Sequence, residues 1–198
     1  MSFKKLCGHL KTITDHKFKV MNLCFKSGLV WQGLMHDMSK YTIVELKTGA
    51  KYYQGNKSPN AVERREKGYS PAWLHHKGRN KHHLEYWIDI SYDKNGVLGA
   101  KMPLKYALEM ACDRIGACKA YHGKDYKDGD ALEYYNMRKE SVEPYLHPDT
   151  AKLLVEILTS LRDEGEEKAT AFMRWLLKHP EYYDHISEKN VATNDTQQ

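Results

Sequence analysis

A histidine next to an aspartate, His36-Asp37, is the part of the sequence best suited to carry chemistry. The pair lies in a largely apolar segment, Leu34 to Lys40. A neutral imidazole nitrogen and an ionised carboxylate bind borderline divalent ions well, and adjacent residues near a helix end can converge on one ion. The pair alone also fits a capped helix end with a half-buried histidine. The metal hypothesis therefore depends on partners elsewhere in the chain.

Partners of the right type occur on both sides of the pair. His16 lies upstream, where His16, Val20 and Leu23 recur at the spacing of one helical face. Asp113 lies downstream, inside an apolar helical run in which an acid needs a partner. Each has a simpler interpretation as well. His16 fits a hydrogen-bonded core histidine, and Asp113 fits a salt bridge in the neighbourhood of Arg114.

Four further histidines form two adjacent pairs, His75-His76 and His82-His83. Because neighbouring side chains point in different directions, we expect one member of each pair to face solvent. His76 and His83 are the candidate ligands, since seven residues bring a helix back to nearly the same face. A glycine between the two pairs argues against one continuous helix.

The elements that must position these residues are predicted to be helices. Apolar periodicity and cap signals place them at 3–13, from Thr14 or Asp15 to Gly28, 29–38, 42–53, 103–121, 131–139, 150–162 and 166–178. The spacing of Thr42 and Glu45 indicates a capping box. Two short helices suit the histidine-rich segment, and an Asn-Gly turn signal predicts a small hairpin or irregular loop over 88–101.

Composition narrows the fold and the class of function. The predicted elements are nearly all helices, which indicates an all-α fold. The length of 198 residues, with 41% hydrophobic and 29% charged residues, predicts one domain over 1–186, and the polar segment 187–198 is predicted to be a disordered tail. A net charge of +5 permits an anionic substrate. The sequence has neither a basic stripe nor a recognisable nucleic-acid-binding module, so nucleic acid is not expected as the main partner. The four cysteines form no CxxC pair, which predicts a reducing, cytoplasmic location. The sequence contains no apolar stretch long enough for a membrane span, so none is expected.

The order His16, His36-Asp37, Asp113 on successive helices resembles the HD-domain superfamily of metal-dependent phosphohydrolases, over roughly residues 14 to 121. In that family these positions bind a divalent metal, the doublet aspartate can bridge to a second ion, and a metal-bound water attacks a phosphoester. The resemblance implies an HD-like helical bundle with one or two ions of Mn2+, Fe2+, Zn2+ or Mg2+. The histidine pairs are similar to the extra ligands of binuclear members, which implies His76 and His83 at a second ion.

The same resemblance implies roles for nearby residues. Asp37 would be the bridging ligand, and Asp37 and Lys40 would be the catalytic residues. Lys40 matches the lysine of the HDxGK motif in the branch that cleaves cyclic dinucleotides. Lys40 would contact phosphate, and Arg79 or Lys81 are assigned to substrate binding on their charge. Glu109, one turn before Asp113, is a ligand, a support for one, or a solvated side chain.

The sequence also departs from the HD pattern. Ser39 replaces the usual glycine of HDxGK, and no GYP signature follows, so the branch and the substrate stay open. The combination of HDMSK, HHxxxxxHH and EMxCD is also similar to a small bacterial and phage family of unassigned function.

Three functions remain in competition. The leading one is a phosphohydrolase acting on a small phosphorylated molecule, with a nucleotide as the first candidate. The second is a noncatalytic helical module closed around a structural ion, which would lack an open coordination position. The third is HD-type di-iron oxygenation, which a mixed-valent iron pair would favour. The sequence identifies neither the oligomeric state nor a protein partner.

Overall fold

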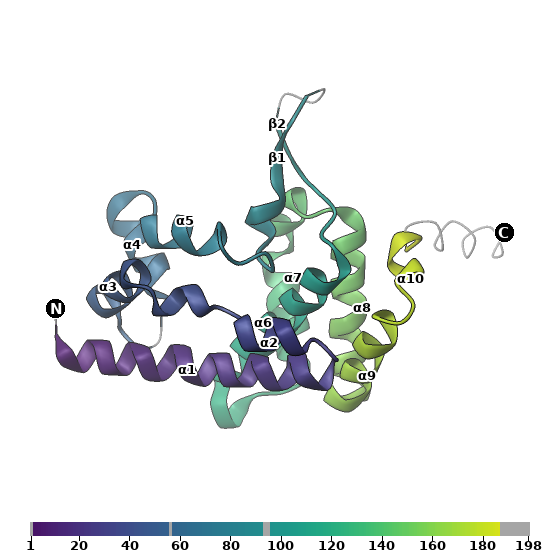
Figure 1. Cartoon of the computed structure of the whole chain (residues 1–198), viewed down its shortest axis with the longest axis horizontal. Coiled ribbons are helices and arrows are strands. Elements are labelled where there is room, and N and C mark those ends of the chain that lie inside the picture. The colour runs from purple at the N-terminus through teal and green to yellow at the C-terminus, as the bar shows by residue number, and fades with distance from the viewer. Residues whose placement is uncertain (1, 56, 93–95, 187–198) are drawn as a thin grey trace.

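Two long helices, α1 (Phe3–Lys26) and α6 (Leu104–His122), pack against each other and form the frame of the molecule (Figure 1). The computed structural model describes residues 2–55, 57–92 and 96–186. α6 is buried on almost every side, as expected of a central helix. α1 buries a single face, made of His9, Ile13, His16, Val20, Leu23 and Cys24.

The helix break predicted at Thr14 or Asp15 is wrong, because α1 continues through both. Thr14 Oγ1 lies 3.0 Å from the hydroxyl of Tyr41 and does not cap a helix. Asp15 forms an ion pair with Lys19, one turn along the same helix. His16 consequently lies in the interior of a long helix, where its backbone is held on both sides.

The His-Asp pair lies in a bend between two elements. The predicted helix end at Gly28 is present: α1 stops just before this glycine, whose φ is 84°, and α2 (Val30–Met35) follows. α2 stops before the predicted end at Met38, so the pair precedes a 3-10 turn, Met38–Tyr41. The predicted helix over 42–53 is present as α3 (Ile43–Tyr52).

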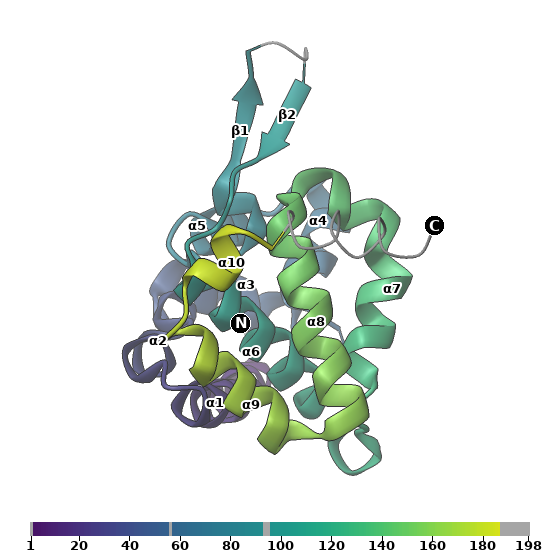
Figure 2. The same cartoon turned by 90° about the vertical axis from the view of Figure 1, so that its right-hand side faces the viewer.

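The histidine-rich segment leads from two short helices into a hairpin. α4 (Pro59–Lys67) and α5 (Pro71–Lys77) pack against α3, and a 3-10 turn, Leu84–Trp87, takes the place of a second predicted helix. β1 (Ile88–Ser91) and β2 (Gly96–Gly99) pair antiparallel and project from the helical body (Figures 1 and 2). The predicted hairpin is confirmed, although its turn at 93–95 lies outside the described residues.

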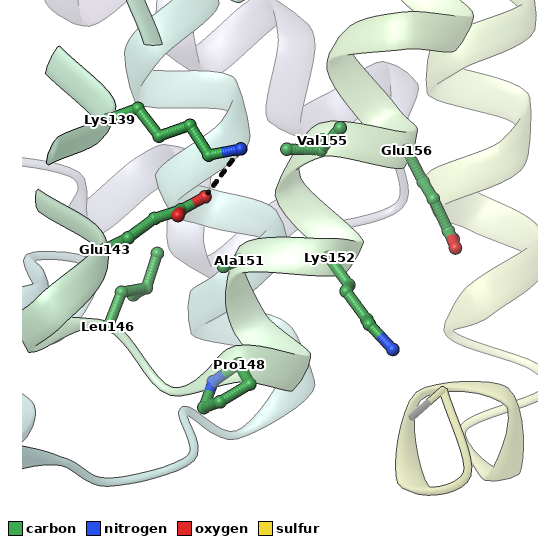
Figure 3. A pocket seen from close by; sticks show the side chains of 8 residues that line it. All are labelled: Lys139, Glu143, Leu146, Pro148, Ala151, Lys152, Val155 and Glu156. Carbon is green, nitrogen blue, oxygen red and sulfur yellow. Dashed lines mark ion pairs between the residues drawn. The ribbon is translucent and has the colours of Figure 1, made fainter. Parts of the chain in front are cut away.

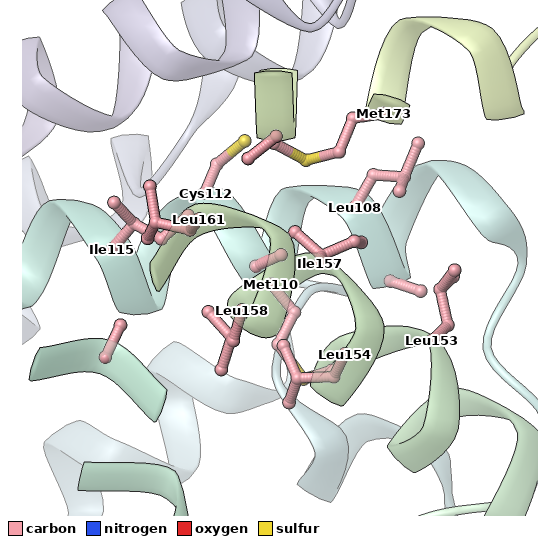
Figure 4. Close-up of a cluster of buried hydrophobic side chains, with 14 of the residues drawn as sticks. Leu108, Met110, Cys112, Ile115, Leu153, Leu154, Ile157, Leu158, Leu161 and Met173 are labelled. Carbon is pink, nitrogen blue, oxygen red and sulfur yellow. The ribbon is translucent and has the colours of Figure 1, made fainter. Parts of the chain in front are cut away.

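The C-terminal helices build the core beside α6. They are α7 (Asp130–Val142), α8 (Pro148–Glu164), α9 (Glu166–Leu176) and the short α10 (Glu181–Asp184). The first three correspond to the helices predicted over 131–139, 150–162 and 166–178, and each begins and ends within one helical turn of its predicted bounds. α8 packs against α6, α7 and α9, and its apolar face fills the space beside α6 (Figure 4). That face consists of Leu153, Leu154, Ile157, Leu158 and Leu161. Each such side chain contributes about 1.5–3 kcal/mol when fully buried, so α8 holds α6 firmly in place.

The predicted fold class is confirmed: the chain is all-α with one small hairpin. Among the described residues, no helix combines the length and the apolar character needed to cross a bilayer. The predicted disordered tail at 187–198 lies outside the described residues.

Candidate metal centre

Two groups of histidine and aspartate side chains meet beside α6, and Asp37 belongs to both. Within each group the potential ligand atoms all lie within 4.8 Å of one another, which is close enough to hold a metal ion. The first group is His16, His36, Asp37 and Asp113. The second group is Asp37, His76, His82 and His83. The structure thus brings together every residue that the sequence predicted as a ligand, and it adds His82.

The first group joins α1, the bend and α6. His16 Nε2 lies 3.0 Å from Asp113 Oδ1, and His36 Nε2 lies 3.4 Å from the same oxygen. These contacts depend on a close approach of α1 and α6, because a Cβ atom built on Gly116 would lie only 2.5 Å from Val20 Cγ2. A residue without a side chain therefore lets the two ligand-bearing helices meet.

The second group reaches Asp37 from the opposite side. His76 Nε2 and His82 Nε2 lie 3.2 and 3.5 Å from Asp37 Oδ1. The other oxygen, Oδ2, lies 3.3 Å from His36 Nε2 and 3.8 Å from His16 Nε2. Each oxygen of one carboxylate therefore faces a different group of histidines.

The backbone of Asp37 makes this placement possible. Its φ of 54° and ψ of 24° are left-handed, and no other residue except glycine has a positive φ in the part of the chain described here. Aspartate tolerates this region better than most residues, at a cost of roughly 1 kcal/mol. Lys17 Nζ fixes the bend by donating to the carbonyls of Leu34 and His36, both at 2.8 Å.

Glu109 supports one histidine from each group. Its Oε1 lies 3.0 Å from Nδ1 of His36 and 3.0 Å from Nδ1 of His82. A carboxylate at this place accepts from both Nδ1–H groups, which leaves the Nε2 lone pairs directed towards the Asp37 carboxylate. Glu109 is buried, which excludes the solvated role that the sequence left open. Its contacts fit a support, and together with His36 and His82 it also forms a third group whose potential ligand atoms lie within 4.8 Å of one another.

Glu45 plays the same part on the other side of the site, and the sequence interpretation missed it. Its two oxygens lie 2.8 Å from Nδ1 of His75 and 2.8 Å from Nδ1 of His76. The predicted capping box is absent, since the hydroxyl of Thr42 donates to the carbonyl of Ser39. The spacing of Thr42 and Glu45 therefore assigned Glu45 the wrong role, and no sequence pattern marks its contact with the two histidines.

Ser39, at the position of the expected glycine, also contacts the second group. Its hydroxyl lies 3.1 Å from Nδ1 of His76 and accepts a hydrogen bond of 2.7 Å from Asn80 Nδ2. Asn80 was not predicted as part of the site, and its Nδ2 also donates to the carbonyl of His76 at 2.8 Å. The serine therefore ties the bend that carries Asp37 to the helix that carries His76.

The expectation that one member of each histidine pair faces solvent is wrong for both pairs, because His76 and His82 are buried and His75 and His83 are half-buried. His75 points away from the two groups, towards Glu45, but His82 and His83 both belong to the second group. Residues 80–83 form a turn, with the amide of His83 bonded to the carbonyl of Asn80, and helical spacing does not apply there.

Buried atoms without hydrogen bonds converge on this place. They are Nε2 of His16, His36 and His82 and both carboxylate oxygens of Asp37. Lys40 offsets part of the charge at Asp37 Oδ2, and the imidazole nitrogens and carboxylate oxygens face one another in the interior, an arrangement that a cation would stabilise. A set of imidazole and carboxylate donors suits a divalent transition metal, so the residues present fit such an ion.

Opposite charges dominate the electrostatics of the first group. Burial by itself would raise the pKa of Asp37, but His36 and Lys40 outweigh it and hold that pKa well below its ordinary value. Burial by itself would lower the pKa of His36, but Asp37 and Asp113 outweigh it and hold that pKa well above its ordinary value. The Asp37 carboxylate is therefore kept ionised, as a metal ligand must be, whereas His36 must give up a proton when it binds an ion.

The three predicted phosphate-binding residues have different positions. Lys40 Nζ lies 2.5 Å from Asp37 Oδ2 and therefore belongs to the site. Arg79 is exposed, and its guanidinium donates to the carbonyl of His75. Lys81 is also exposed, with its ammonium 5.5 Å from the ring of Tyr86. Neither Arg79 nor Lys81 lines the cavities beside the two groups.

Two cavities of about 780 Å3 each open beside the site. The α6/α7 cavity is lined by His82, His83, Asp113 and residues of α6 and α7. The lysine cavity is lined by His16 and Asp113 together with Lys11, Lys40 and Lys57. Asp113 lines both cavities, so this candidate ligand lies between them.

A smaller cavity of about 480 Å3 lies between the end of α7 and the start of α8 (Figure 3). Lys139 and Glu143 form an ion pair of 3.7 Å in it, and none of the histidines of the two groups lines it. This cavity is therefore separate from the candidate metal centre.

The comparisons with known proteins concern the same part of the chain. Residues 5–160 match the family of unknown function DUF5662, and this range contains all residues of both groups. Neither a curated protein nor a solved structure matches the chain. Because the match covers most of the sequence, the chain belongs to the family of unknown function DUF5662.

Proposed function

We propose that this protein is a metal-dependent phosphohydrolase of the HD type that acts on a small phosphorylated molecule, with a nucleotide as the first candidate. One observation carries the proposal: the two oxygens of Asp37 face different histidine groups, as expected of a carboxylate that bridges two ions. The buried Nε2 atoms of His36 and His82, which make no hydrogen bond, support it, because a merely structural histidine cluster would satisfy them internally.

The donor atoms favour particular ions. His16, His36, Asp37 and Asp113 would hold the first ion, and Asp37 with His76, His82 and His83 would hold a second. Because imidazole nitrogens make up half of the first group and three of the four ligands of the second, Mn2+, Fe2+ and Zn2+ suit the site better than Mg2+ does. When bound, such an ion lowers the pKa of its water towards neutrality and offsets charge on phosphoryl oxygens.

The residues of the chain supply orientation and charge. Glu109 and Glu45 hold three of the histidine rings with Nε2 turned inward. Lys40 adds a positive charge beside Asp37 and lines the lysine cavity with Lys11 and Lys57. Three ammonium groups around one cavity attract an anionic group and position it next to the ligands.

The test combines metal content with turnover. Natively purified protein is analysed for metals and assayed against phosphomonoesters and cyclic dinucleotides with Mn2+, Co2+ or Fe2+. Asp37→Asn should lose about 1,000-fold or more in turnover while its circular dichroism stays unchanged, because removal of a central catalytic group has effects of that order. Asp163→Asn, which changes an exposed carboxylate on α8, is the matched control and should keep full activity.

Other outcomes would contradict the proposal in distinct ways. Unchanged turnover in Asp37→Asn would exclude this carboxylate from the mechanism. Tightly held metal without any phosphoester cleavage would indicate a structural ion, and a mixed-valent iron signal in such protein would indicate oxygen chemistry. If His76→Ala and His83→Ala keep the full metal content, the site contains only the first group.

A further inference from the structure

The helix α2 presents apolar side chains to the outside of the molecule. Four of its six residues are large and apolar, and they are between 45% and 68% exposed: Val30, Trp31, Leu34 and Met35. Their spacing places them on one side of the helix, and the buried Gly33 lies on the other side. In Figure 2, α2 lies at the left edge of the molecule, and no element of the described part of the chain lies beyond it there.

Two contacts with α1 fix this orientation. A Cβ atom built on Gly33 would lie only 3.1 Å from Cδ1 of Phe25, so the bare backbone of α2 packs closely on α1. At the other end of α2, Lys17 Nζ donates to the carbonyls of Leu34 and His36. Because α2 rests on α1 along its glycine, its large side chains must point away from the body of the molecule.

Two phenylalanines of α1 extend the apolar surface. Phe25 lies against Gly33 and is 41% exposed, and Phe18, which is 58% exposed, shares its side of α1 because it lies seven residues earlier. Together these side chains form the α2 face, which consists of Phe18, Phe25, Val30, Trp31, Leu34 and Met35. Side chains of these sizes at these exposures leave roughly 600–700 Å2 of surface open. The largest apolar patch on a monomer is usually about 300–600 Å2, whereas each partner in a stable interface contributes about 800 Å2. The α2 face with its rim is therefore large enough for a stable protein interface.

The α2 face carries no charge that would select a charged partner. Residues 27–36 contain no Asp, Glu, Lys or Arg. The lysines at its rim are engaged by the protein itself: Lys17 by backbone carbonyls, Lys26 by a glutamate of α9, and Lys40 by the Asp37 carboxylate. These ammonium groups are therefore not free for lipid phosphates, on which binding to an anionic membrane surface depends.

A second copy of the chain fits such a face best. The segment 187–198 is a poor cover by its composition, because Val191 and Ala192 are its only apolar residues. A two-fold contact places the same patch on both sides, so it requires a surface that can meet itself without apposed like charges. The α2 face meets this requirement, and its aromatic and methionine side chains are of the types enriched at interface cores.

We propose that the α2 face is the interface of a homodimer, in which α2 of one protomer packs against α2 of its partner around a two-fold axis. Because Met35 immediately precedes His36, the interface would adjoin the candidate metal centre of each protomer. This inference goes beyond the proposed hydrolase function and does not depend on it.

The first test measures association of the full chain by sedimentation velocity between about 1 and 100 µM. The wild type should form dimers within this range. Trp31→Glu should weaken dimerisation by about a hundredfold or more, because the dimer would bury two like charges. Met137→Glu is the matched control: it places the same charge on an exposed apolar residue of α7 and should associate as the wild type does.

A charge swap identifies the partner as a second copy of the chain. Trp31→Lys alone should be as monomeric as Trp31→Glu alone. An equal mixture of the two variants should form heterodimers at low salt, because opposite charges then meet across the axis. Variants that had lost their fold would not regain association on mixing, so this experiment separates a lost interface from a lost fold.

Oxidative footprinting locates the interface without any substitution. Met35 is 48% exposed in the protomer and Met137 is 76% exposed. Mass action populates the dimer at high concentration, so hydrogen peroxide should oxidise Met35 several-fold more slowly at about 100 µM than at about 1 µM protein. Met137 should react at the same rate at both concentrations.

Several outcomes would overturn the homodimer. One is a wild type that stays monomeric at about 100 µM, and binding of that monomer to phosphatidylglycerol vesicles through Trp31 would show that a lipid surface covers the face instead. Another is a dimer that persists in Trp31→Glu while Met35 reacts equally at both concentrations, which would place the interface elsewhere. Hydrolysis of phosphoesters, or its absence, bears only on the proposed function.

Discussion

The carboxylate of Asp37 faces both histidine groups because its backbone adopts a left-handed conformation. The backbone of Asp37 therefore sets the bend, and its side chain supplies the charge and the ligand oxygens. Asparagine also tolerates positive φ, so Asp37→Asn removes charge while it keeps the bend. Asp37→Ala changes both at once, since alanine is strained at this φ. The asparagine variant is consequently the cleaner test of chemistry at this position.

Glu109 offers a test of how the imidazoles are positioned. Glu109→Ala removes the acceptor shared by His36 and His82, and the affinity for Mn2+ should fall by about 10- to 100-fold, the usual effect of losing such a support. Glu109→Gln keeps one oxygen in the same place and should recover a substantial part of the loss. Competition with a chelating dye measures both affinities.

The control for Glu109 is Glu140→Ala, at an exposed position of α7, which should bind Mn2+ as the wild type does. An Mn2+ affinity in Glu109→Ala equal to that of Glu140→Ala would show that the orientation of His36 and His82 does not depend on this carboxylate.

The candidate ligands could be predicted from the sequence, but their supports could not. His16, His36, Asp37 and Asp113 are recognisable because ligand residue types recur on apolar helices in a known order. The role of Glu45 depends on where a helix thirty residues away in sequence places its histidines. Such pairings are set by the tertiary path of the chain, and no local pattern encodes them.

Close contact between α1 and α6 is the next requirement of the site. Gly116→Ala places a methyl group where Val20 Cγ2 lies, so the two helices must separate. We expect a loss of about 1–3 kcal/mol in the free energy of unfolding, measured with urea, and weaker metal binding because His16 and Asp113 move apart. Gly129→Ala, whose added Cβ would meet Arg162 Cγ at 3.4 Å, is the control and should change stability by about 0.5 kcal/mol or less. Equal stability of the two variants would contradict the close contact.

An ion-pair cluster joins α1, α6 and α9 and makes stability depend on pH. Lys26 and Lys119 both pair with Glu166; burial by itself would raise the pKa of Glu166, but the two lysines outweigh it and hold that pKa below its ordinary value of 4.5. A depressed carboxyl pKa stabilises the fold above the unfolded value, and the contribution disappears as the pH falls through the folded value.

Glu166→Gln should therefore lower the free energy of unfolding by about 1 kcal/mol near neutral pH, and the difference from the wild type should shrink below about pH 4.5. Urea titrations at several pH values measure this difference, with Glu140→Gln as the exposed control. A difference that grows towards acid pH would have the wrong sign for this mechanism.

Most helices were predictable because their ends carry local signals. Gly28 and Pro103 mark boundaries that the structure reproduces within two residues. The break predicted at Thr14 was wrong because its hydroxyl bonds to Tyr41, a residue distant in sequence. Local cap signals thus fail where a tertiary contact takes the capping side chain.

For the molecule as a whole, the ligands come from segments between residues 16 and 113, and an ion would cross-link them. An ion that binds only the native state stabilises it by about 2.7 kcal/mol at a hundredfold excess over its Kd. Mn2+ should therefore raise the melting temperature by roughly 5–10 °C, and a chelator should reverse the change. Asp37→Asn should show a much smaller rise in calorimetry. A rise of equal size in that variant would show that the ion binds elsewhere.

The buried position of α6 against α8 determines when the site can form during synthesis. Every candidate ligand has left the ribosome once residue 113 emerges, but the leucines of α8 follow only from residue 153 onward. Until they arrive, α6 has no partner on that side and the ligands have no fixed frame. A nascent chain would thus present its histidines well before it could arrange them, and metal loading would belong to the last stage of folding.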